Sequence, residues 1–343
     1  MNEISVKGPT AEEALRNYFL NIGYFVVRGC KFKYCNNDVT DIDLWLYEKG
    51  SPFRRQRVNV DIKNKKTPQA IERIFWAKGL QSVLNLDACI VATTDTRPEV
   101  RAFGLDHGVS VLDGSFVGRL VKSGKSQQQR ITEEDFISSI EESSLGKIGG
   151  DWKGRYEQSK SRLLDALNFD GANAWLNDTQ YFLNQAIQSQ NAAFVEWRLV
   201  YTSISFFLIS VDFILREHVA ADHDQKKLLL ENGFRYGSAG RNYTQKVGEL
   251  ASELVTEYID KPGIKDEVRR ALMEQAEAIR SDLLAEHLSK VIVSSHLFEQ
   301  AKEFENNAFQ SSVQAPSSMS SSAKSLIGVL SDFFSIDRKK TLV

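Results

Sequence analysis

The spacing of apolar residues changes partway along the chain. Residues 57–63 alternate between apolar and polar side chains, and in residues 41–47 the aliphatic residues occupy every second position, as in β-strands. From about residue 155 to residue 310, apolar residues instead recur every three or four positions, which is typical of helices. A chain of 343 residues that changes in this way is expected to form an α/β domain followed by an all-α domain.

The first part of the chain predicts helices and strands in alternation. The expected helices cover residues 10–22, 68–84 and 97–107, and the expected strands cover residues 24–27, 41–47, 57–63, 88–93 and 109–112. Thr10 and Thr67 are expected to cap the first two helices, with Pro68 at the first helical position and Gly23 ending the first helix. Residues 31–40 are expected to form a loop or hairpin. This order predicts a mixed sheet flanked by helices.

The rest of the chain predicts a separate helical region. The expected organisation is a first domain at 1–125, a linker at 126–154, a helical domain at 155–310 and a Ser-rich flexible segment with a short amphipathic helix at 311–343. A single helix is expected over residues 264–305. Residues 199–215 are strongly apolar but shorter than the roughly 20 residues of a bilayer span, so we expect a buried helix and no membrane association.

Charge is divided unevenly between the two parts. Residues 1–130 contain 20 Lys and Arg against 14 Asp and Glu, whereas the remainder contains 23 against 31. The excess of positive charge in the first part suits a polyanionic partner. Three cysteines and an N-terminus without a basic-then-apolar pattern indicate a cytoplasmic protein without structural disulfides.

Acidic residues and one lysine occur where the predicted strands would bring them together. Asp61 and Lys63 are two residues apart on one strand and therefore lie on the same side. Asp43 lies 18 residues earlier, on the strand expected to pair with it, and is preferred to Asp41 because it lies deeper in that strand. Glu12 lies on the inward face of the first helix, more so than Glu13 does. Carboxylate oxygens of this kind are ligands that Mg²⁺ prefers.

The set formed by Glu12, Asp43 and the Asp61-Ile62-Lys63 tripeptide resembles the PD-(D/E)xK superfamily of restriction-endonuclease-like nucleases. The stretch from residue 88 to residue 114 is similar to the closing strand, helix and strand of Mrr-like restriction endonucleases, and the resemblance covers about residues 8–120. It implies a restriction-endonuclease-like fold. It also implies a Mg²⁺-dependent endonuclease, with Mn²⁺ able to substitute, in which Asp43, Asp61 and Glu12 hold the metal and Lys63 assists catalysis.

Basic side chains near this set are the candidate contacts to nucleic-acid phosphates: Arg54, Arg55, Arg57, Lys65, Lys66 and Arg73. DNA is favoured over RNA as the substrate. The helical domain is expected to mediate homo-oligomerisation or binding of a partner protein, an arrangement similar to that of bacterial anti-phage defence proteins.

Two alternatives remain open at this point. The first is a catalytically inactive nucleic-acid-binding or assembly subunit that retains a degenerate nuclease fold. The second is a nuclease subunit that cuts only inside a larger complex. A solvated strand face in which Asp61 and Lys63 form a surface ion pair is the simplest explanation that involves no function.

Overall fold

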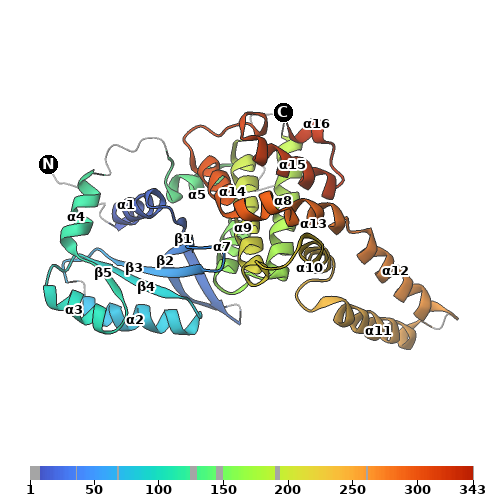
Figure 1. Cartoon of the computed structure of the whole chain (residues 1–343), viewed down its shortest axis with the longest axis horizontal. Helices are drawn as coiled ribbons and strands as arrows, with labels where there is room; N and C mark the ends of the chain where they lie inside the picture. The colour runs from blue at the N-terminus through green and yellow to red at the C-terminus, as the bar shows by residue number, and fades with distance from the viewer. Residues whose placement is uncertain are drawn as a thin grey trace. The chain divides into compact units, whose positions relative to one another are not determined.

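The structure is a computed structural model that describes residues 8–35, 37–67, 69–123, 130–143, 150–189, 194–259 and 262–342. The chain divides into two compact units (Figure 1). Unit 1 contains residues 1–165 with 309–312, and unit 2 contains residues 166–308 with 313–343. The mixed sheet lies in unit 1 and unit 2 is helical, so the predicted fold class is confirmed.

Five strands form the sheet of unit 1 in the order β1-β2-β3-β4-β5. They are β1 (Phe25–Tyr34), β2 (Asn37–Lys49), β3 (Arg55–Lys63), β4 (Ala88–Thr93) and β5 (Ser110–Leu112). Strands β1, β2 and β3 pair antiparallel, and β4 and β5 add to β3 in parallel. The parallel pairs require crossover connections, and helices supply them.

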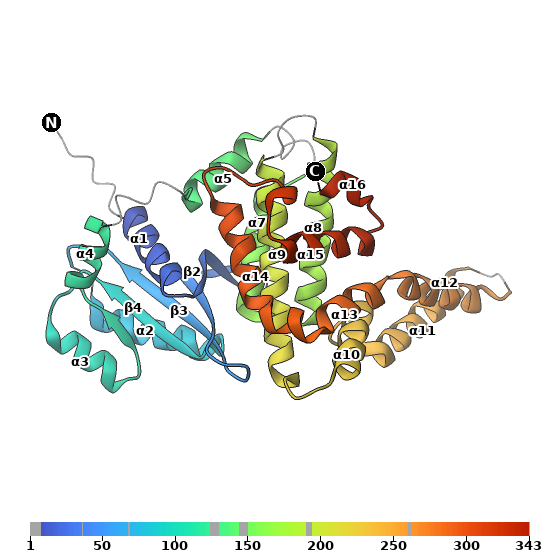
Figure 2. The same cartoon turned by 45° about the horizontal axis from the view of Figure 1, so that its top comes forward.

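Helices cover both faces of the sheet (Figures 1 and 2). The crossovers α2 (Ala70–Val83) and α3 (Pro98–Asp106) lie on one face, and α1 (Gly8–Asn21) and α4 (Gly114–Ser123) lie on the other. Each face has its own core of buried apolar residues. The α1 side includes Leu15, Phe19, Leu44, Leu46, Val58, Val60 and Ile62, and the α2 side includes Ile74, Ala77, Val91, Val100 and Val109.

The strands that precede the site are longer than predicted. β1 continues to Tyr34 and β2 begins at Asn37, so most of residues 31–40 is strand within a hairpin. Tyr34 and Val39 are exposed there. Near the hairpin tip, β1 and β2 pair only with each other and do not pack on a core. The sequence there therefore lacks the apolar alternation that would predict strands.

Two predicted helix caps are wrong. α1 already includes Thr10 inside the helix, because it begins at Gly8, whereas its end before Gly23, which has φ 105°, agrees with the prediction. α2 begins at Ala70 and its N-cap is Gln69, in a left-handed conformation with φ 48°. Thr67 therefore does not cap α2, and Pro68 lies outside the described residues.

The expected linker contains structure that belongs to unit 1. Helix α5 (Glu133–Glu142) lies within residues 126–154, and α7 (Trp152–Asp165) begins inside them. A capping box between Thr132 and Asp135 starts α5. Only Phe136 and Ile140 supply buried apolar side chains in its ten residues, which explains why the helix has a weak apolar period.

Unit 2 is built from helices, with 3-10 turns at Arg216–His218 and Pro316–Ser318. The helices are α8 (Phe169–Gln188), α9 (Phe194–Leu215), α10 (His223–Tyr236), α11 (Gly240–Tyr258), α12 (Ile264–Ala278), α13 (Ser281–Ser289), α14 (Val291–Phe309), α15 (Ser321–Phe333) and α16 (Arg338–Thr341). The single helix expected over 264–305 is thus three helices, since tertiary packing breaks it where the sequence has neither Gly nor Pro. α15 starts inside the Ser-rich segment expected to be flexible, because Leu326 and Leu330 are buried on unit 2.

One helix in the described residues is long and apolar enough to cross a membrane by length and composition. It runs from Phe194 to His218, and 94% of its most apolar window is buried inside the protein. The expectation of a buried helix is confirmed, and the burial is consistent with a soluble protein.

Candidate functional site

The alternation of β3 directs its polar residues toward α2. Val60 and Ile62 pack into the core on the α1 side, so Asn59, Asp61 and Lys63 lie on the opposite face. The Asn59 amide donates a hydrogen bond of 3.2 Å to the carbonyl oxygen of Ala77 in α2, which fixes this orientation. Asp61 and Lys63 therefore share one side of the strand, as predicted from their spacing.

Asp43 lies where β2 and β3 separate. The last paired residues of these strands are Leu44 and Val60, and one further step places Asp43 opposite Asp61. The strands do not continue the ladder here. Instead, Asp43 Oδ2 accepts a hydrogen bond of 2.5 Å from the backbone N–H of Ile62. A carboxylate thus takes a position that a backbone carbonyl would fill in a regular antiparallel pair.

Electrostatics link Asp43 to the other predicted site residues. Burial, with help from the charges of Asp61 and Glu12, raises the pKa of Asp43 to about 6, although the Ile62 N–H and the Lys63 ammonium act in the opposite direction. The charges of Asp61, Glu12 and Lys63 are therefore the ones that act on the Asp43 carboxyl group.

Arg73 pairs with Asp61 from the first turn of α2. Its Nε donates to Asp61 Oδ2 at 2.7 Å, and its Nη2 contacts Asp61 Oδ1, which makes a bidentate ion pair. The Asp61 side chain is 7% exposed and that of Arg73 is 22% exposed. Arg73 was a candidate phosphate contact, but in this structure it neutralises the carboxylate at the centre of the site.

Glu12 is held by Arg28 of β1. Arg28 Nε donates to Glu12 Oε2 at 2.7 Å, and the same guanidinium binds Glu13 and Glu134. The expectation that Glu12 faces inward more than Glu13 is wrong, since their side chains are 27% and 16% exposed. The reason is that Glu13 is drawn in by Arg28 and by the buried Arg16.

The other candidate phosphate contacts fall into two groups. Arg54, Arg55 and Arg57 lie at the start of β3, and the backbone between Arg55 and Asp61 spans about 20 Å. Arg55 donates to the carbonyl oxygen of Ser51, so it stabilises the β2–β3 turn. Lys65 and Lys66 are exposed and lie two and three residues beyond the end of β3.

Two carboxylates, those of Asp43 and Asp61, are the oxygen donors of the candidate site. Within the described residues, no group of three or more His, Cys, Asp or Glu side chains is arranged to hold a metal ion. Asp43 and Asp61 offer oxygen ligands on adjoining strands, and Mg²⁺ is commonly held by one or two carboxylates with water and substrate phosphate as its other ligands. Such binding requires the Arg73 guanidinium to leave Asp61.

The sequence did not predict the arginines that pair with the carboxylates of the candidate site, Arg28 with Glu12 and Arg73 with Asp61. Arg28 was not selected, although it is a charged residue within an otherwise apolar segment, Phe25–Cys30, and that contrast is the signal that marks it. Its buried guanidinium is 7% exposed and connects α1, β1 and α5. The Arg73 pair gave no such signal, because it depends on how α2 packs against β3.

Replacing Asp43 with Asn is expected to stabilise the metal-free protein at neutral pH. The pKa of Asp43 in the folded state, about 6, lies above the ordinary 3.8. The part of the folding stability that depends on protonated Asp43 is therefore fully present below pH 3.8. It is lost as the pH rises through 6 and the buried carboxyl group ionises. Asp43→Asn should raise the free energy of unfolding by at most about 3 kcal/mol at pH 7.5, with little difference near pH 4.

Urea unfolding in EDTA at several pH values measures this difference. The matched control is Asp41→Asn, which changes an exposed carboxylate on the same strand and should leave stability nearly unchanged. A stability difference between Asp43→Asn and the unmodified protein that is constant from pH 4 to pH 7.5 would contradict the prediction.

The chain matches no known protein family, no curated protein and no solved structure.

Proposed function

We propose that unit 1 is a Mg²⁺-dependent nuclease of the PD-(D/E)xK type that hydrolyses phosphodiester bonds, with DNA favoured as its substrate. One observation carries the proposal. Asp43 of β2 accepts a hydrogen bond from the backbone N–H of Ile62 in β3, the residue between Asp61 and Lys63, at the point where the paired part of the two strands ends. The mixed sheet with helices on both faces supports a restriction-endonuclease-like fold.

Each residue has a defined task in this proposal. Asp43 and Asp61 would hold Mg²⁺, which, when bound, polarises the phosphate and lowers the pKa of water. Lys63 lies on the same side of β3 as Asp61 and is suited to stabilise negative charge that develops on the phosphate oxygens. Glu12 acts through its charge on Asp43 and is held in position by Arg28.

A catalytically inactive binding or assembly protein is the second candidate. Arg73 already neutralises Asp61, and Arg28 already binds Glu12, as expected if these ion pairs have replaced a metal ion. Such a protein would bind nucleic acid in the presence of EDTA and would release no cleaved product.

The helical unit supports a role in assembly. The side chains of Tyr243, Val247, Leu250, Leu254 and Tyr258 are spaced along one face of α11 and are 46–84% exposed. Exposed apolar surface of this kind is typical of contacts between proteins. We therefore propose homo-oligomerisation or partner binding through unit 2. We also propose a cytoplasmic defence nuclease, which agrees with the free thiols of Cys30, Cys35 and Cys89.

The experiment that tests nuclease activity uses purified full-length protein and four substrates: plasmid, linear duplex, single-stranded DNA and RNA. Each is incubated with Mg²⁺, Mn²⁺ or EDTA. We expect cleavage of DNA with either metal and none with EDTA. EDTA-insensitive binding without any product would favour the inactive alternative. Cleavage that appears only after addition of a cell extract would identify a missing partner.

A further inference from the structure

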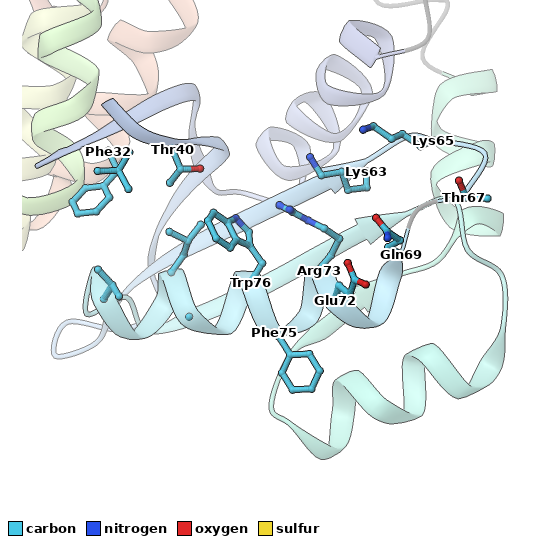
Figure 3. A pocket seen from close by; sticks show the side chains of 14 residues that line it. Phe32, Thr40, Lys63, Lys65, Thr67, Gln69, Glu72, Arg73, Phe75 and Trp76 are labelled. Carbon is cyan, nitrogen blue, oxygen red and sulfur yellow. The ribbon is translucent and has the colours of Figure 1, made fainter. Parts of the chain in front are cut away.

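A groove of about 750 Å³ leads away from the candidate site along α2 (Figure 3). One wall is α2, with Arg73 and Trp76, and the other is the β1–β2 hairpin, with Phe32 and Thr40. Lys63 and Lys65 also line the groove and, with Arg73, outnumber the acidic lining residue Glu72, so the groove combines positive charge with apolar surface. Its volume lies within the roughly 300–1,000 Å³ of sites that hold small organic ligands.

Trp76 is the main apolar feature of this groove. Its side chain is 44% exposed, whereas Trp45, Trp152 and Trp175 are buried. In Figure 3 the indole stands on α2 and faces the hairpin. The Arg73 guanidinium lies 5.6 Å from the indole ring centroid, so the cation that binds Asp61 also lies beside the ring.

We propose that this groove binds an unpaired stretch of nucleic acid, with one base stacked on Trp76 and the adjoining phosphates close to Lys65 and Arg73. This inference rests on the proposed function, since it names the substrate class of the same site. Two arguments support it. Exposed aromatic rings beside positive charge are the usual platform for single strands, because every unpaired base presents a π-face. In a duplex those faces are stacked and cannot reach the ring.

The proposal also assigns a task to Arg73. A phosphate that enters the groove competes with Asp61 for the guanidinium. Binding of the strand would then draw Arg73 away from Asp61 and free that carboxylate. Substrate binding would thus be coupled to exposure of the Asp61 carboxylate.

Fluorescence anisotropy of labelled oligonucleotides, measured in EDTA, tests binding separately from cleavage. We expect Trp76→Ala to weaken binding of a single strand roughly 5- to 150-fold, as the loss of one stacked base predicts. Trp76→Phe should retain most of the affinity because it keeps a ring. Phe53→Ala removes an exposed aromatic side chain away from the groove and should change affinity less than about twofold. Comparing DNA with RNA oligonucleotides shows whether the groove prefers strands that contain deoxyribose or ribose.

The outcomes separate this proposal from the proposed function. Equal loss of duplex and single-strand binding in Trp76→Ala, or no loss at all, would overturn the groove assignment even if the protein cuts DNA. Selective loss of single-strand binding would support it even if no cleavage is found. Quenching of tryptophan fluorescence by an unlabelled single strand, absent in Trp76→Phe, is the expected direct signature of stacking.

Discussion

Substituting Asp61 with Asn is expected to reduce Mg²⁺-dependent cleavage at least about 100-fold, the scale on which loss of one charge-stabilising group acts. The amide removes the negative charge that would hold the metal, and it keeps the shape of the side chain. Arg73 loses its ion-pair partner, but its side chain is already 22% exposed and can turn toward water. The fold should therefore survive the substitution.

Initial rates of cleavage at saturating Mg²⁺, on the DNA substrate that the unmodified protein cuts fastest, measure this effect, and circular dichroism checks the fold. Lys63→Ala should show a loss of similar size, because its amine lies on the same side of β3. Asp41→Asn is the matched control, since Asp41 is an exposed carboxylate on the strand that carries Asp43. Folded Asp61→Asn protein that cuts at the unmodified rate would refute the metal site.

Exchanging Lys160 for Met is expected to lower the free energy of unfolding of unit 1 by about 3–5 kcal/mol. Lys160 Nζ donates to Glu133 Oε1 at 2.6 Å and to the carbonyl oxygen of Arg28 at 3.1 Å. Lys160 is 3% exposed and Glu133 is 5% exposed, so the substitution leaves a buried carboxylate without its nearest cation. Arg16 remains, but its closest approach to Glu133 is 3.9 Å.

The pKa of Glu133 gives this prediction a pH dependence. Burial alone would raise it, but the charges of Lys160 and Arg16 outweigh burial and hold it below the ordinary 4.5. The contribution of Glu133 is therefore present above pH 4.5 and is lost as the pH falls below that value. The cost of Lys160→Met should be largest near neutral pH and smaller in acid.

Urea unfolding at pH 7 compares Lys160→Met with Lys153→Met, which removes the exposed pair between Lys153 and Glu141 and should leave stability nearly unchanged. Adding Glu133→Leu to Lys160→Met should restore much of the lost stability, because it removes the unpaired charge. Equal stability of the two single variants would show that the buried pair contributes nothing specific.

This network also shows that unit 1 is longer than the first domain expected from the sequence. Lys160 lies in α7 and Glu133 begins α5, and both lie beyond the first domain expected at 1–125. Lys160 of α7 donates a hydrogen bond to the carbonyl oxygen of Arg28 in β1, and the side chain of Arg28 binds Glu12. The residues that position the candidate site therefore extend to Asp165, the boundary of unit 1.

Local sequence was sufficient to predict the sheet and the face of β3 on which Asp61 and Lys63 lie. Apolar residues at every second position of β2 and β3 assign the remaining side chains to the opposite face, and apolar segments mark β4 and the crossover helices. Asp61 and Lys63 share a side because the strand repeats every two residues. Asp43 follows once β2 and β3 are known to pair, since a hairpin connection leaves few registers possible.

Tertiary structure alone decided which charges these side chains meet. The Arg73 pair with Asp61 depends on where α2 begins, which local cap signals misplaced at Thr67. The Arg28 cluster joins α1, β1 and α5, and Glu134 lies 106 residues away in sequence. The physical reason is that apolar period and turn residues act over a few positions, whereas an ion pair forms wherever packing brings two side chains together.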